Sequence, residues 1–202
     1  MTSASRATTA TPVRSVAALR SGFERDGWVV VPALLSADEC VAVVDADAGR
    51  QWPVVSDALR PWIFDARWLA TLEGLGAGGR AFREQLVTKA PHAETRVPWH
   101  QDAAYLDAAP AFTTIFVALE AIDERNGCLR MQPGSHRRGL IEHRPCGYVL
   151  EAVDAPSDEG VSVTLAPGDA VVFGSSLLHQ SLGNHTATRR LAWMLQFRDA
   201  DA

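Results

Sequence analysis

The part of the chain from Ala81 onward is broken into short apolar runs separated by Pro, Gly, Asn and Asp, with few helical spacings. This pattern is typical of an antiparallel sandwich or barrel. Turn signals stand between the runs, namely DERNG at 123–127, QPGSH at 132–136 and APGD at 166–169. The runs predict eight strands, over 82–89, 96–102, 112–120, 128–132, 161–165, 169–174, 177–181 and 188–198. We therefore expect a mainly β fold with flanking helices, a double-sheet jelly roll.

The first 80 residues have a mostly helical pattern. Val16, Leu19 and Phe23 share one helical face, and Ser36 followed by Glu39 has the capping-box pattern. A third helical candidate, DARWLATLEGLGAGG, ends in glycines, whereas WVVVPAL is typical of a short strand. The predicted organisation is a disordered leader over 1–13 and a single domain over 14–202, with a helical flank over 14–80 and a jelly-roll core over 81–198.

Composition and charge narrow the classes of partner. The chain has 202 residues, 47% of them hydrophobic, which suits one core. Its net charge of -5 comes from 24 acidic and 19 basic residues mixed along the chain, so we expect neither a nucleic acid nor a membrane as partner. The three cysteines form no C-x-x-C pair, which favours reduced thiols and a cytoplasmic location. A small molecule is the expected ligand.

The stretch VPWHQDAAYLD, at 97–107, places a histidine and an aspartate two positions apart among apolar neighbours. Residues i and i+2 of a strand point to the same face, so a strand over 96–102 would project His100 and Asp102 together. An isolated H-x-D is more often a structural pair, with the aspartate bound to an arginine. The motif needs a third ligand to indicate a metal site.

His179 supplies that third ligand, at the end of a predicted strand in GDAVVFGSSLLHQSLGNHT. Two neutral imidazoles and one carboxylate on one face of an octahedral ion are the ligands of non-haem Fe(II) oxygenases, and three positions then stay open for a co-substrate and O2. His100, Asp102 and His179 together make up this set.

An oxygenase of this kind also has to hold the far carboxylate of 2-oxoglutarate, for which the planar fork of an arginine is well suited. Alternation along the last strand separates two candidates. One face carries Arg190, Ala192, Met194 and Gln196, and the other carries Arg189, Leu191, Trp193, Leu195 and Phe197. The second face is bulky and apolar, as packing beneath helices requires. Arg190, with small Ala192 beside it, is the better candidate to border a cavity.

Five motifs in order, WHQD, NGCLRMQPGSH, APGDAVVF, LLHQSLGNHT and RRLAW, resemble those of the phytanoyl-CoA dioxygenase family of Fe(II)/2-oxoglutarate oxygenases. The resemblance extends from about Phe23 to Phe197. It implies a double-stranded β-helix, a cupin-like jelly roll, with Fe(II), 2-oxoglutarate and O2 as cofactor and co-substrates. Its motifs map the iron ligands to His100, Asp102 and His179, and the 2-oxoglutarate ligands to Arg190 and Ser181.

The resemblance also implies a reaction in which a C–H bond of a small molecule is oxidised while 2-oxoglutarate is converted to succinate and CO2. Related halogenases have a small residue in place of the aspartate, so Asp102 favours hydroxylation. Desaturation, epoxidation and cyclisation use the same ligands and stay open. The substrate is expected to be a small molecule, with natural products and amino-acid-like metabolites as candidates, and the polar loop from Glu142 to Gly160 is the candidate lid.

Two other classes of protein compete with this interpretation. One is a non-catalytic jelly-roll module, and the other is a metal-dependent cupin that does not use 2-oxoglutarate. Neither accounts for Arg190 at this spacing. Several residues have both a structural and a functional interpretation at this point, namely Lys89, Tyr105, Thr114, Phe116, Arg130 and His136.

Overall fold

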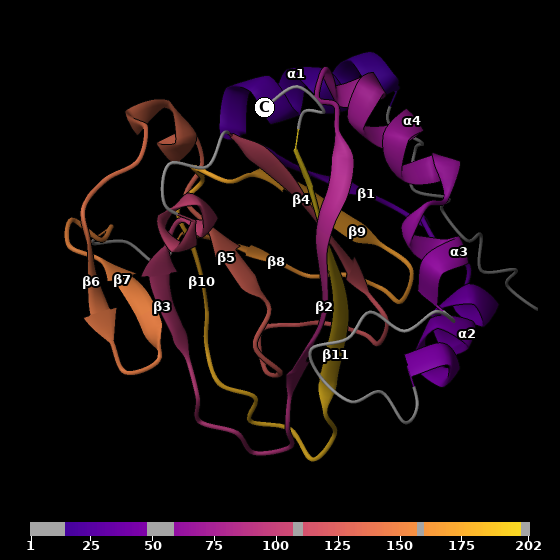
Figure 1. Ribbon diagram of the computed structural model, residues 1–202. Coiled ribbons are helices and arrows are strands. Elements are labelled where there is room, and N and C mark those ends of the chain that lie inside the picture. Colours follow the sequence, from indigo (N-terminus) through magenta and orange to yellow (C-terminus); the bar gives the residue numbers. More distant parts are fainter. Residues whose placement is uncertain (1–14, 48–58, 107–110, 157–159, 199–202) are drawn as a thin grey trace, which may run out of the picture.

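The computed structural model describes residues 15–47, 59–106, 111–156 and 160–198, so the predicted leader over 1–13 lies outside the described residues. Two antiparallel sheets face one another and form the predicted jelly roll (Figure 1). The larger sheet has the order β1-β9-β4-β11-β2, with β1 (Trp28–Val31), β2 (Arg80–Lys89), β4 (Phe112–Ala118), β9 (Ala170–Gly174) and β11 (Arg190–Arg198). The smaller has the order β3-β10-β5-β8, with β3 (Val97–His100), β5 (Leu129–Met131), β8 (Val161–Val163) and β10 (His179–Ser181).

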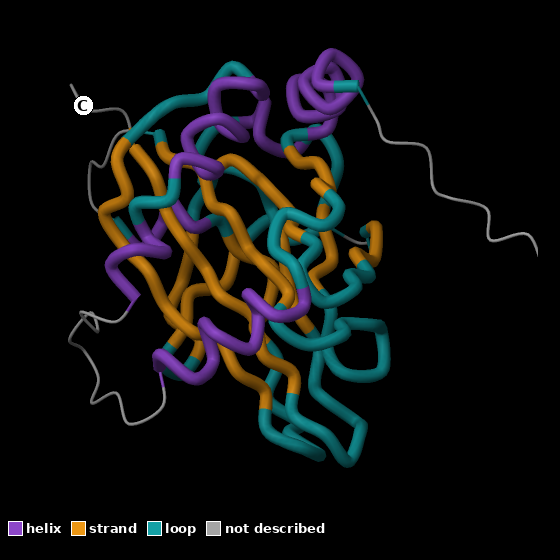
Figure 2. Tube along the Cα trace, turned by 90° about the vertical axis from the view of Figure 1, so that its right-hand side faces the viewer, coloured by secondary structure: helices purple, strands orange, loops and turns teal. Residues whose placement is uncertain are grey.

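Among the described residues, α2 (Ala37–Asp47), α3 (Arg60–Ile63) and α4 (Ala66–Leu75) lie along one side of the strands, and α1 (Val16–Asp26) lies at the top of the molecule in the view of Figure 1 (Figures 1 and 2). The predicted capping box of α2 is confirmed, because the Ser36 amide donates to Glu39 at 2.7 Å and the Glu39 amide donates to Ser36 at 3.2 Å. No helix among the described residues is long and apolar enough to cross a membrane.

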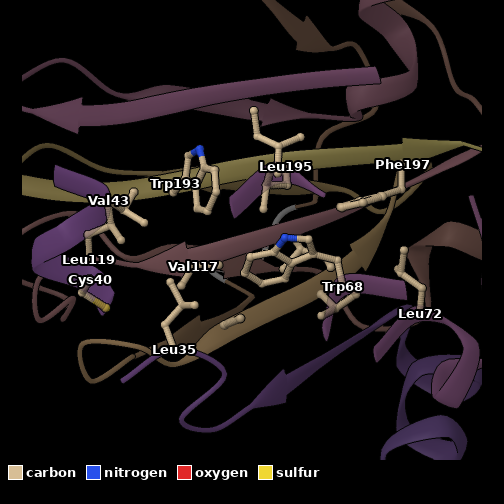
Figure 3. Close-up of a cluster of buried hydrophobic side chains, with 14 of the residues drawn as sticks. Leu35, Cys40, Val43, Trp68, Leu72, Val117, Leu119, Trp193, Leu195 and Phe197 are labelled. Atoms are coloured by element: carbon tan, nitrogen blue, oxygen red, sulfur yellow. The ribbon is translucent and has the colours of Figure 1, made fainter. Parts of the chain in front are cut away.

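Alternation along β11 divides the core in two. Leu191, Trp193, Leu195 and Phe197 pack beneath the helices, where Trp193 meets Trp68 of α4 edge to face at 5.8 Å (Figure 3). Ala192 and Met194 belong to the second cluster, which lies on the inner face toward the smaller sheet. The predicted assignment of faces on β11 is therefore confirmed, and Arg190 lies on the inner face.

Three predictions about elements are corrected. The short strand in WVVVPAL is present, but as β1 it pairs with β9, so the jelly-roll sheet begins inside the segment predicted as a helical flank. Asp102 is not on a strand, because β3 ends at His100 and Asp102 opens the short 3-10 helix η2 (Asp102–Tyr105). The predicted polar loop over 142–160 contains a hairpin of β6 (His143–Cys146) and β7 (Val149–Ala152).

Candidate metal centre

The two histidines meet because β10 pairs with β3. The register places His179 directly opposite His100, so both side chains point to the same face of the smaller sheet. Their ring centroids lie 4.1 Å apart, and both residues are buried. Residues far apart in the sequence thus form one pair through antiparallel hydrogen bonding.

The carboxylate of Asp102 completes the cluster from η2. Its Oδ1 lies 3.6 Å from Nε2 of His100 and 3.6 Å from Nε2 of His179. One ligand atom from each of the three residues lies within 4.8 Å of the others, which is close enough for a single ion to bind all three. The i and i+2 argument paired two residues that do lie together in the structure, although η2 and not a strand presents the aspartate.

The outer nitrogen of each imidazole is held by a backbone carbonyl. Nδ1 of His100 lies 2.9 Å from the Pro98 oxygen, and Nδ1 of His179 lies 3.0 Å from the Leu177 oxygen. A carbonyl oxygen only accepts hydrogen bonds, so Nδ1 carries the proton in both rings and each Nε2 presents its lone pair to the centre. This is the arrangement that metal-binding histidines adopt.

The protonation states also suit a cation. Burial, followed by the neighbouring His100, lowers the pKa of His179 to about 4. Burial acts to raise the pKa of Asp102, but His179 and His100, together with a hydrogen bond from Thr114, outweigh it and lower that pKa to about 2. At neutral pH the centre therefore offers a neutral imidazole at His179 and a charged carboxylate at Asp102, as binding of a divalent ion requires.

Arg190 is a buried cation with no acidic partner among the described residues. Its side chain is 1% exposed, and its Nη2 and Nη1 donate to the carbonyl oxygens of Gly127 at 3.0 Å and Val87 at 3.4 Å. Its Nε is buried without a hydrogen-bond partner. Burial lowers the pKa of Arg190 to about 10. A desolvated guanidinium of this kind is a natural site for an anion.

Lys89 adds a second buried cation next to Arg190. The two residues are direct partners across β2 and β11, and both pack on Gly127, where an added Cβ would come within 2.8 Å of the Lys89 Cδ. The Lys89 Nζ donates to the Thr95 oxygen at 2.9 Å. Burial, and then the charge of Arg190, lowers the pKa of Lys89 to about 8. Lys89 is thus neither an exposed edge lysine nor a surface charge.

Ser181 is buried on β10, two residues after His179. Arg190 belongs to the opposite sheet, so the two predicted 2-oxoglutarate ligands come from both walls of the sandwich. His136 does not belong to the cluster of His100, Asp102 and His179, and it lies in the 3-10 helix η3 (Ser135–Arg138), where its ring packs against Gly27.

Sequence reasoning assigned no role at the centre to Gln196 and left that of Thr114 open. Both donate hydrogen bonds to Oδ2 of Asp102, at 3.2 Å from Gln196 and 3.0 Å from Thr114. Alternation had placed Gln196 on the face of Arg190, which was the available signal. Tyr105, whose role was also open, lies edge-on to His100 at 5.7 Å, and its hydroxyl accepts from the Leu150 amide of β7 at 2.9 Å.

The chain is similar to known proteins in family, in sequence and in structure. A family model described as phytanoyl-CoA dioxygenase matches residues 51–192. A 2-aminoethylphosphonate dioxygenase of an uncultured bacterium, HF130_AEPn_1, is 32% identical over 133 residues, which are 62% of this chain and 48% of that protein. The chain spans less than half the length of the first curated relatives that it matches.

Two solved structures share the fold over most of the chain. EvdO2 from Micromonospora carbonacea var. aurantiaca, complexed with 2-oxoglutarate, has a TM-score of 0.79 at 24% identity and covers 90% of each chain. The epimerase SnoN in complex with Fe3+, alpha ketoglutarate and nogalamycin RO has a TM-score of 0.75 at 25% identity, over 92% of this chain and 84% of that chain.

Proposed function

The chain belongs to the phytanoyl-CoA dioxygenase family, and on this premise we propose that it is a non-haem Fe(II)/2-oxoglutarate-dependent dioxygenase that hydroxylates a small molecule. In the proposed reaction one atom of O2 enters the substrate as a hydroxyl group. The other enters succinate, as 2-oxoglutarate loses CO2. The observation that carries the proposal is the buried cluster of His100, Asp102 and His179.

These three residues would hold Fe(II), which when bound supplies the activation of O2. The chain's own contribution is the geometry and protonation of the donors. The carbonyls of Pro98 and Leu177 keep both Nε2 lone pairs directed at the centre. The carboxylate of Asp102 adds one negative charge, so a divalent ion is only partly neutralised and retains its attraction for the anionic co-substrate.

Arg190 would bind the distal carboxylate of 2-oxoglutarate, with Ser181 as a further donor. The guanidinium supports this role because it is buried on the inner face of β11, lacks an acidic partner among the described residues and has a free Nε. Lys89 beside it raises the positive potential at the same end of the sandwich. An anion that enters this space would relieve the repulsion between the two buried cations.

Hydroxylation is the proposed reaction because Asp102 occupies the ligand position that a halide would need. For the substrate we propose a natural product or an amino-acid-like metabolite. The relatives support this range, since one acts on 2-aminoethylphosphonate and one structure contains nogalamycin RO. A cytoplasmic location is proposed from the cysteines, because Cys40, Cys128 and Cys146 are all unpaired.

The test is anaerobic addition of Fe(II) and 2-oxoglutarate to the purified protein, followed by visible absorption. We expect the weak charge-transfer band of chelated 2-oxoglutarate, and we expect Arg190→Leu to lose it. Arg189→Ala is the matched control. Arg189 is half exposed, and its Nε forms an ion pair of 2.9 Å with Glu120 and not with a residue of the candidate centre.

Each contrary result points to a particular rival. If iron binds and the band does not form, the protein is a metal-binding jelly roll that does not use 2-oxoglutarate. If no iron binds, His100 and Asp102 are a structural pair.

A further inference from the structure

The two oxygens of the Asp102 carboxylate have different surroundings. Oδ1 faces the Nε2 atoms of His100 and His179, each at 3.6 Å. Oδ2 faces away from them and accepts two hydrogen bonds, from Thr114 Oγ1 at 3.0 Å and from Gln196 Nε2 at 3.2 Å. One oxygen is therefore directed at the metal position, and the other is engaged by the protein.

The two donors come from the sheet opposite the histidines. Thr114 of β4 and Gln196 of β11 are direct cross-strand partners, so their side chains share the inner face of the larger sheet. Both are buried, with 0% and 2% of their surface exposed. A third bond of 3.3 Å joins Gln196 Nε2 to Thr114 Oγ1. The pair forms a small platform beneath the carboxylate.

The directions of these bonds follow from the chemistry of the groups. An ionised carboxylate only accepts, so the hydroxyl of Thr114 and the amide NH2 of Gln196 must both donate to Asp102. The Gln196 Oε1 consequently points elsewhere, and it is buried without a partner. This orientation of the Gln196 amide is favoured although it leaves Oε1 unpaired. Exchanging Oε1 and Nε2 would place Oε1 next to Oδ2 of Asp102, and two acceptors cannot form a hydrogen bond.

The backbone on both sides of Asp102 is held, since the Ala103 amide donates to the Ser175 oxygen at 3.0 Å and the Gln101 side chain donates to the Ser176 oxygen at 2.6 Å. These bonds fix where the side chain begins and leave the rotation of its carboxylate to other contacts. The strand ends at His100, and Asp102 opens a 3-10 helix whose capping residue, Gln101, makes no side-chain capping bond. We propose that Thr114 and Gln196 are positioning residues that hold Asp102 by Oδ2, so that the carboxylate offers the metal ion only Oδ1. This inference rests on the metal site of the proposed function.

One-oxygen binding has a direct consequence for the reaction. Two imidazole nitrogens and one carboxylate oxygen leave three positions of an octahedral ion open, two for 2-oxoglutarate and one for O2. A carboxylate free to rotate can bind through both oxygens and would occupy one of those positions. The hydrogen bonds to Oδ2 oppose that rotation, because turning the carboxylate would leave two buried donors unpaired.

The experiment compares matched variants at adjacent positions. Thr114→Val keeps the shape of the side chain and removes the hydroxyl, whereas Thr114→Ser keeps the hydroxyl. Thr113→Val is the control, since Thr113 is also buried on β4 but alternates to the other face. Gln196→Met tests the second donor independently, and thermal unfolding of each variant checks its fold.

Two readouts do not depend on turnover. Anaerobic titration gives the Kd for Fe(II), and the visible spectrum of the Co(II)-loaded protein reports the coordination number. We expect Thr114→Val and Gln196→Met to weaken Fe(II) binding by about 10- to 100-fold and to change the Co(II) spectrum. Thr114→Ser and Thr113→Val should match the wild type.

Folded Thr114→Val and Gln196→Met proteins with wild-type Fe(II) affinity and an unchanged Co(II) spectrum would overturn the proposal. So would equal losses in Thr114→Val and Thr114→Ser, because the hydroxyl would then not be the active group. If the wild type binds Fe(II) without forming the 2-oxoglutarate band, the dioxygenase function fails, while the metal affinities still decide the role of the two residues.

Discussion

At the scale of single residues, Lys89 and Arg190 show how burial lowers the pKa of a basic side chain. Each is a cation inside the sandwich, and no carboxylate among the described residues pairs with either. Burial without a counter-ion favours the neutral form, which is why the pKa of Lys89 falls to about 8. Because an unfolded lysine binds its proton up to about pH 10.4, the buried charge destabilises the fold fully below pH 8. This destabilisation is lost as the pH rises from about 8, the pKa of Lys89 in the folded protein, to about 10.4, its pKa in the unfolded chain.

The same shift predicts the pH dependence of 2-oxoglutarate binding. A bound carboxylate favours charged Lys89, so binding takes up a proton above the pKa of about 8. Affinity should therefore fall as the pH rises above 8, toward a limit of about tenfold per pH unit. Calorimetric titration of the Mn(II)-loaded protein between pH 7 and 9.5 measures this. Lys89→Met should bind more weakly at pH 7 and lose the dependence, and a wild-type curve that is flat over this range contradicts the prediction.

The hairpin of β6 and β7, which lies in the segment predicted as a polar loop, contacts the elements that carry His100 and Asp102. It packs on β3, and its Leu150 amide donates to the Tyr105 hydroxyl at 2.9 Å. Tyr105 also lies edge-on to His100. Just before the hairpin, the Ile141 amide donates a hydrogen bond of 2.9 Å to Oε1 of Gln101, which is buried next to His100. These contacts connect the candidate lid to β3 and η2, the elements that carry His100 and Asp102.

Tyr105→Phe should loosen the hairpin and leave the metal ligands in place. The change removes one hydrogen bond worth about 1 kcal/mol, so the Leu150 amide should exchange its hydrogen about fivefold faster. Tyr148→Phe is the control, because Tyr148 is 84% exposed at the hairpin tip. Hydrogen exchange measures the opening, and the charge-transfer band should be unchanged. If exchange at Leu150 is the same in both variants, Tyr105 does not anchor the lid.

At the scale of the whole molecule, the candidate centre joins the two sheets. His100 and His179 belong to the smaller sheet, whereas Asp102 is held by Thr114 and Gln196 of the larger one. An ion bound by all three residues therefore links the walls of the sandwich on the side opposite the helical layer. Since the unfolded chain brings these ligands together only rarely, metal binding should stabilise the fold.

The expected stabilisation is about 2.7 kcal/mol with Co(II) at 100 times its Kd, measured by urea unfolding with and without the metal. Asp102→Ala should abolish most of this gain, together with iron-dependent turnover. Asp45→Ala, an exposed change on α2, should retain it. An equal gain in Asp102→Ala would remove Asp102 from the ligand set.

Local patterns predicted much of this protein because they depend on neighbouring residues. The period of two along β11 separated Arg190 from Arg189, and the capping box identified the start of α2. The pairing of β1 with β9 was not predictable in this way, since it joins residues that are far apart in the sequence. The end of β3 at His100 was also missed, because where the strand stops depends on its pairing with β10, which is distant in sequence.

The sequence alone determined the strand-rich second half, the two faces of β11 and the choice of His100, Asp102 and His179 as candidate metal ligands, since periodicity and residue chemistry are properties of short segments. Tertiary packing decided which oxygen of Asp102 faces the centre, that Lys89 is buried beside Arg190, and that Thr114 and Gln196 meet Asp102. The reason is physical: hydrogen-bond partners, desolvation and the pKa values that follow from them depend on strands that are distant in sequence and adjacent only in the folded chain.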